Sequence, residues 1–369
     1  MEQLNGRNRL IDIIKGIMIL PIVVFHLVYR TKDGAFDIAV REASYLSLSV
    51  FMLFSGYFYN QDNKIKEIIS KRSKKLLFPV IIIMLALLAL FGPYYILTHN
   101  YTLEMWFWDG SMVFLRPELI AVLKPDYTGG QLFNNLSPVW FIWTLAFSRA
   151  IFILVMKIVK TSRIKFILSF SALVIIGCIT YVHIQPLPWS LTLTPLCAAI
   201  MMIGAALHEN RVIEKLSKIN LIVSFLISAA ACFIHYLIFI NFADESLYRS
   251  FIGDKGYISA AVFVFQVLFG GFAVLTLARL IDRIKYFNDA FLWIGRHTLV
   301  ILLFHVLIGG LAMDAMHTYN KPGEHWYLNP LPVEVVIKSV ISFIISLAGC
   351  FGLCALNDKL KRRLKNKTS

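Results

Sequence analysis

The chain has 369 residues, of which 58% are hydrophobic and only 16% charged, and its mean hydropathy is +0.70. A soluble domain of this size could not cover its surface with so few charges, so the composition excludes an ordinary soluble protein and indicates the bilayer as the main solvent. In a soluble protein the formal net charge of +14 would suggest nucleic acid as a partner. In this chain the positions of the basic residues along the sequence explain the positive charge better.

Apolar runs of about 20 residues, long enough to cross the hydrocarbon as a helix, recur along the whole sequence. In chain order they predict ten spans, at 10–30, 43–59, 76–98, 137–156, 166–184, 189–207, 219–240, 257–278, 291–313 and 333–356. Most connections are short, which favours antiparallel neighbours. We therefore expect an all-α polytopic membrane protein, a bundle of about ten transmembrane helices that forms a single domain over 1–369.

Two further predictions concern the first span and the cysteines. The first span carries three ionisable residues and no small-residue cleavage site follows it, so we expect a retained helix and not a signal peptide. The five cysteines all fall inside predicted spans without metal-ligand spacing, so we predict no metal site and interpret them as packing residues.

The orientation follows from the basic residues between the spans. With the N-terminus inside, the inner segments hold 24 Lys and Arg residues and the outer segments hold eight. Such a bias predicts a multi-pass protein of the cell membrane with both termini in the cytoplasm. The positive charge is then mostly a cytoplasmic fringe facing anionic membrane lipid, and it requires no nucleic acid.

The first span holds Asp12, Lys15 and His26, and charges inside a membrane are costly unless they are paired or face water. Asp12 precedes Lys15 by three residues, within pairing reach on one helix face. Lys15 and His26 are eleven residues apart, which puts them roughly 20° from one meridian and about 16 Å apart along the axis. This stripe predicts a polar cavity; the alternatives are a snorkelling Asp12–Lys15 pair and a purely interhelical hydrogen bond from His26.

The ninth span carries another histidine, His305, about 14 residues from its predicted inner end, whereas His26 lies about 16 residues from its own. At ~1.5 Å per residue the two imidazoles are at similar depth in the outer half of the membrane. We therefore expect them to meet across one cavity.

A run of cations precedes the third span, at Lys71, Arg72, Lys74 and Lys75. Cations at a helix entrance suit a polyphosphate ligand such as the nucleotide end of coenzyme A. The alternative is that the run serves only as a positive-inside anchor.

These residues, in this order, resemble the acyltransferase family 3 of membrane proteins, which includes O-acetyltransferases and fucose-4-O-acetylase-like enzymes. The opening at 9–26 is similar to the family's basic residue followed by ten residues and a histidine. Four later stretches are similar to further family motifs: the run closing on Ser-Gly-Tyr at 50–58, the cations at 72–75, the Trp-Phe helix start at 138–142 and the late helix at 295–305. Lys75 departs from the usual arginine, which keeps the charge but loses the bidentate fork.

The resemblance implies a standalone membrane acyltransferase that moves an acyl group, expected to be acetyl, from cytoplasmic acyl-CoA to a glycan or lipid-linked sugar at the outer side. Acyl-CoA is then a donor substrate, and no permanently bound cofactor is expected. His26 would serve as general base or as transient acyl carrier, and the residues leave both roles open. His305 would orient the acyl group, and Lys71 to Lys75 would hold the CoA phosphates. The alternative function is a transporter or flippase that uses the same polar stripe as a substrate path.

Overall fold

The structure, a computed structural model, describes residues 3–4, 7–28, 35–59, 73–98, 140–184, 187–242, 256–316 and 333–368. A two-residue hairpin pairs β1 (Gln3–Leu4) with β2 (Arg7–Asn8), and helices make up nearly all the rest of the described chain. The helices are α1 (Arg9–Leu27), α2 (Ala35–Tyr57), α4 (Ser73–Thr98), α8 (Trp140–Val159), α9 (Arg163–His183), the 3-10 turn η3 (Pro188–Leu193), α10 (Thr194–Glu209), α11 (Val212–Ser217), α12 (Leu221–Phe242), α13 (Gly256–Asp282), α14 (Lys285–Arg296), α15 (Thr298–Ala315) and α16 (Val333–Thr368).

The predicted all-α membrane class is confirmed. Among the described residues, seven helices are long and apolar enough to cross a membrane, or eight if α14 and α15 are one span. The other two predicted spans fall on α4 and α12, where the apolar stretches are the shorter Leu76–Ala86 and Leu221–Leu237. The count of about ten therefore stays a prediction, as does the assignment of the whole chain to one domain.

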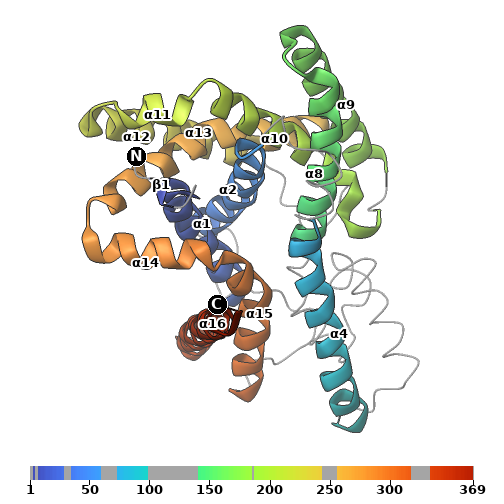
Figure 1. Cartoon of the computed structure of the whole chain (residues 1–369), viewed down its shortest axis with the longest axis vertical. Helices are drawn as coiled ribbons and strands as arrows, with labels where there is room; N and C mark the ends of the chain where they lie inside the picture. The colour runs from blue at the N-terminus through green and yellow to red at the C-terminus, as the bar shows by residue number, and fades with distance from the viewer. Residues whose placement is uncertain are drawn as a thin grey trace.

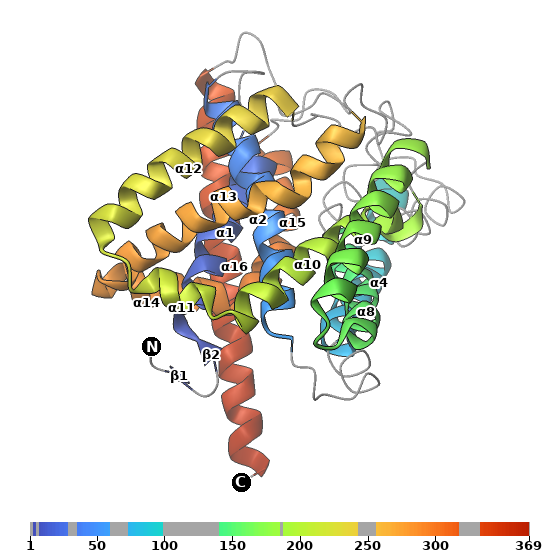
Figure 2. The same cartoon turned by 90° about the horizontal axis from the view of Figure 1, so that it is seen from above.

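Helix α1 is the centre of the bundle. It packs against α2, α13, α14, α15 and α16, and its residues from Leu10 to Val23 supply much of the buried apolar core. Helices α15 and α16 pack closely beside it, while α4, α8 and α9 stand together at one side (Figures 1 and 2). Figure 2 also shows the C-terminal part of α16 running beyond the other helices.

Glycines allow two helix pairs to touch backbone to backbone. A Cβ at Gly16 of α1 would overlap the carbonyl oxygen of Phe291, and a Cβ at Gly295 of α14 would overlap that of Asp12. Small residues permit such close approach in membranes, where packing replaces the hydrophobic effect as the force between helices. The contact fixes the point at which α14 crosses α1.

The pair α2 and α10 is built in the same way. Gly56 of α2 lies against the carbonyl of Met201, and Gly204 of α10 lies against the carbonyl of Leu53. Both crossings use reciprocal glycines, so α1 and α2 are each held against a partner at a fixed point.

The ninth predicted span, 291–313, is wrong as a single straight helix. The chain bends by 81° between α14 and α15, and His297 between them has φ −112° and ψ 12°, outside helical geometry. The imidazole of His297 stabilises this break: its Nδ1 donates to the carbonyl of Trp293 at 2.8 Å, and its Nε2 bonds the Asp358 carboxylate at 3.0 Å. A contact with a residue so distant in sequence leaves no mark on local hydropathy.

Candidate functional site

The charged residues of α1 pair as their spacing predicted. Lys15 Nζ lies 3.4 Å from Asp12 Oδ1, and the Asp12 side chain is only 8% exposed against 27% for Lys15. Lys15 Nζ also lies 5.5 Å from the centre of the Phe58 ring, beyond the end of α2. The ammonium group is therefore held between a carboxylate and an aromatic face.

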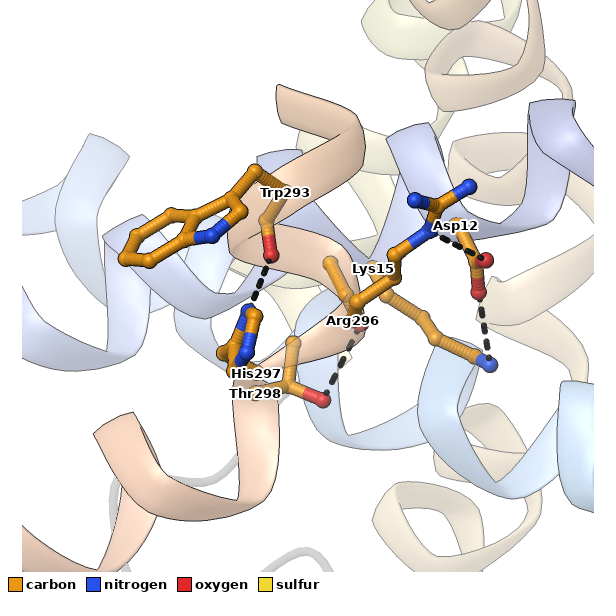
Figure 3. A network of polar contacts seen from close by, with 7 residues as sticks. Asp12, Lys15, Trp293, Arg296, His297 and Thr298 are labelled. Atoms are coloured by element: carbon orange, nitrogen blue, oxygen red, sulfur yellow. Dashed lines mark hydrogen bonds and ion pairs between the residues drawn. The ribbon is translucent and has the colours of Figure 1, made fainter. Parts of the chain in front are cut away.

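A third charge joins this pair from the broken helix. Arg296 Nε lies 3.8 Å from Asp12 Oδ2, so the carboxylate is shared by two cations (Figure 3). The sequence does not predict this contact, because it depends on the tertiary crossing of α14 over α1 at Gly16 and Gly295.

The two histidines lie close together at the other end of the stripe. The ring centres of His26 and His305 are 5.4 Å apart, with an angle of 55° between the ring planes. The predicted proximity of the two imidazoles is thus present in the structure. His26 is half-buried, whereas His305 is fully buried.

The hydrogen bonds of His305 fix which ring nitrogen can act. Its Nδ1 lies 2.8 Å from the carbonyl of Ile301, and because a carbonyl only accepts, Nδ1 carries the proton. Its Nε2 is buried and has no hydrogen-bond partner among the described residues. In the neutral ring Nε2 therefore presents a lone pair, which can accept a proton or a polar hydrogen.

Helix α16 holds the stretch of α15 that carries this histidine. The hydroxyl of Ser346 donates to the carbonyl of His305 at 2.7 Å, and the hydroxyl of Ser342 donates to that of Gly309 at 2.6 Å. Because each serine bonds the residue facing it across two antiparallel helices, the pair fixes how far α15 can slide along α16.

The estimate of equal depth rested on helix ends that the structure corrects. His305 lies only seven residues beyond the start of α15 at Thr298, whereas His26 lies 17 residues beyond the start of α1 at Arg9. Counted from the contact between Gly16 and Gly295, the two histidines are equally far along the sequence. His26 follows Gly16 by ten residues, and His305 follows Gly295 by ten. The path from Gly295 to His305 turns by 81° at His297, and α15 then packs against α1, which brings the two rings together.

Of the predicted phosphate-binding cations, Lys71 and Arg72 lie outside the described residues. Lys74 and Lys75 fall in the first turn of α4, and their side chains lie outside the described part as well. Their role stays a prediction.

A second buried histidine–carboxylate pair lies on other helices. His235 of α12 is buried, and its Nδ1 lies 2.5 Å from Glu42 Oε1 of α2. Sequence analysis did not single it out, although a histidine in the middle of an apolar run is the signal that could have found it.

The fold and this site describe a polytopic membrane protein with a charged end and a paired-imidazole end on one central helix. The family model of the acyltransferase domain, acyltransferase family 3, matches residues 8–354, which include Asp12, Lys15, His26 and His305. The chain belongs to this family and is a membrane acyltransferase. No curated protein and no solved structure matches it.

Proposed function

We propose that the protein transfers an acetyl group from cytoplasmic acyl-CoA to a hydroxyl of a surface glycan or lipid-linked sugar at the outer side of the cell membrane. The pairing of His26 with His305 carries this proposal, because it joins a half-buried imidazole to a buried one with an unpartnered lone pair. Acyl transfer to a hydroxyl needs such a proton acceptor, and the family is one of acyltransferases.

The charged end of α1 is suited to the donor. With both termini in the cytoplasm, Asp12 and Lys15 lie near the inner face and His26 lies in the outer half. The eleven residues from Lys15 to His26 span about 16 Å of helix. The pantetheine arm is on the order of 15–20 Å long from ordinary bond lengths, so a donor held by its phosphates at the inner end brings its thioester to His26.

Two routes fit the paired imidazoles. If His26 acts as base, it takes the acceptor's hydroxyl proton while the oxygen attacks the thioester carbonyl; the C–S bond breaks and the thiolate receives that proton. If His26 acts as carrier, its nitrogen attacks the thioester carbonyl, the C–S bond breaks and CoA leaves as the thiol with the proton from the imidazole. The acceptor hydroxyl then attacks the acyl-imidazole, the C–N bond breaks and the hydroxyl proton passes to an imidazole nitrogen. His305 Nε2 serves either route, because it can accept the proton that His26 or the acceptor gives up.

The decisive experiment measures acetyl transfer from acetyl-CoA by the purified His26→Gln variant. Glutamine keeps hydrogen-bonding capacity but cannot titrate near neutral pH, so transfer should fall at least a hundredfold while the protein elutes as a single species. Transfer within about threefold of the wild type would rule out chemistry at His26.

The transporter alternative gains one observation, since broken spans often line substrate paths in transporters, and the α14–α15 pair is broken. It predicts transport of the lipid-linked sugar without any consumption of acetyl-CoA. The same purified protein, assayed for release of free CoA thiol, separates the two functions.

A further inference from the structure

Arg296 is the charged residue of the site that the proposed roles leave unused. It is the last residue of α14, immediately before the break at His297, and its side chain is 38% exposed. A partly exposed arginine at a broken span, beside the charged end of α1, is placed to meet a ligand that enters from the inner face.

Within the described part of the chain, few contacts engage the guanidinium of Arg296. Its side chain makes one ion pair there, from Nε to Asp12 Oδ2 at 3.8 Å, and this buried oxygen has no hydrogen-bond partner among the described residues. A charge-assisted N–H···O bond is normally 2.7–2.9 Å long. The guanidinium has five donors in a planar fork, so the weak pair with Asp12 orients the group without satisfying it.

The surrounding charge favours an anion. Lys15 and Arg296 share the single carboxylate of Asp12, and Lys15 is held at 3.4 Å, also longer than a tight ion pair (Figure 3). Asp12 therefore holds two cations near one point, and two converging cations favour an anionic ligand.

We propose that Arg296, with Lys15, binds the diphosphate of the acyl-CoA donor, and that Asp12 acts as the counter-ion that positions the two cations. The proposal rests on the proposed function. A bidentate guanidinium matches the oxygens of a diphosphate better than a lone ammonium does. The diphosphate is also the part of CoA attached to the pantetheine arm, and His26 lies about 16 Å along α1 from Lys15.

The test measures binding of CoA and of dephospho-CoA, which keeps the diphosphate but lacks the 3′-phosphate, to the purified full-length chain. Arg296→Gln should weaken both ligands by the same factor, roughly tenfold, the effect of losing a charge-assisted hydrogen bond. The matched control is Arg283→Gln, which removes an exposed arginine from the turn before α14 and should leave both affinities within about twofold. Unchanged affinity in a folded Arg296→Gln variant overturns the proposal, as does a loss for CoA alone.

A double variant distinguishes phosphate binding by Arg296 from a role limited to neutralising the buried Asp12 carboxylate. If Arg296 only offsets the buried carboxylate, the double variant Asp12→Asn with Arg296→Gln regains the wild-type affinity, and the proposal is wrong. If Arg296 binds phosphate, the double variant stays weak. Should Arg296→Gln fail to fold, Arg296→Lys keeps the charge but loses the fork, and both affinities should fall by about threefold; no change would count against the site.

The two proposals fail differently. Wild-type protein that neither binds nor consumes acetyl-CoA contradicts the proposed function itself. Wild-type protein that consumes acetyl-CoA, with an Arg296→Gln variant of unchanged KM, leaves the acyltransferase reaction intact and removes only the diphosphate site.

Discussion

Gly16 and Gly295 bring the backbones of α1 and α14 into direct contact, so that a Cβ on either residue would meet a carbonyl oxygen of the other helix. The contact affects both the charged end of the site and the end that holds the histidine pair. It sets Arg296 beside Asp12, and it is the point from which both histidines are ten residues away.

Gly295→Ala should therefore damage stability and activity together. The added methyl overlaps the carbonyl of Asp12, and relief requires α14 to move off α1, at a cost of about 1–3 kcal/mol for such overpacking. We expect a lower unfolding temperature and at least a tenfold loss of acetyl transfer. Gly271→Ala and Gly352→Ala are matched controls, since a Cβ at either glycine meets no atom within 4 Å, and neither should change transfer. Normal activity in Gly295→Ala would show that the crossing does not set the site.

Ser346→Ala tests whether α16 positions His305. Loss of the hydroxyl removes the 2.7 Å bond to the His305 carbonyl, which contributes roughly 1 kcal/mol. We expect kcat to fall several-fold with little change in the KM for acetyl-CoA, because the proposed donor site lies at the other end of α1. Ser339→Ala is the control: its hydroxyl bonds the carbonyl of Val336 within the same helix, so kcat should be unaffected. Equal effects from the two serines would mean that only helix stability is at stake.

The cation run before α4 gives a separate prediction. Replacing Arg72 and Lys75 together with alanine should weaken acyl-CoA binding while the protein remains inserted, because two cations of the proposed phosphate site are lost. The measurement is CoA affinity at physiological salt. Wild-type affinity in this double variant would reduce the run to a topology signal.

The orientation is tested by reporter fusions. A reporter fused after residue 120 should lie outside the cell membrane, and one fused at residue 369 should lie in the cytoplasm, as the excess of Lys and Arg in the inner segments predicts. If both reporters lie on one side, the topology is wrong, and with it the entry of the donor from the inner face.

Sequence reading predicted the features that depend on neighbouring residues within one helix. The apolar runs predicted helices, and the three-residue spacing of Asp12 and Lys15 predicted their pairing, because both depend on neighbours along one helix. It missed the break at His297, which Asp358 stabilises from another helix, and the second cation on Asp12, which the crossing of α14 over α1 supplies. It reached the proximity of His26 and His305 from the wrong starting points, since the crossing of α14 over α1 and the bend before α15 both depend on tertiary packing.

The equal ten-residue intervals also restrict how this chain can vary in length. One residue inserted between Gly16 and His26 would turn the imidazole by about 100° and carry it about 1.5 Å along the axis, away from His305. A matching insertion in α15 would not restore the pair, because both rings would rotate about different axes. Insertions and deletions among related chains should therefore accumulate in the connections between helices, while these two intervals keep a constant length.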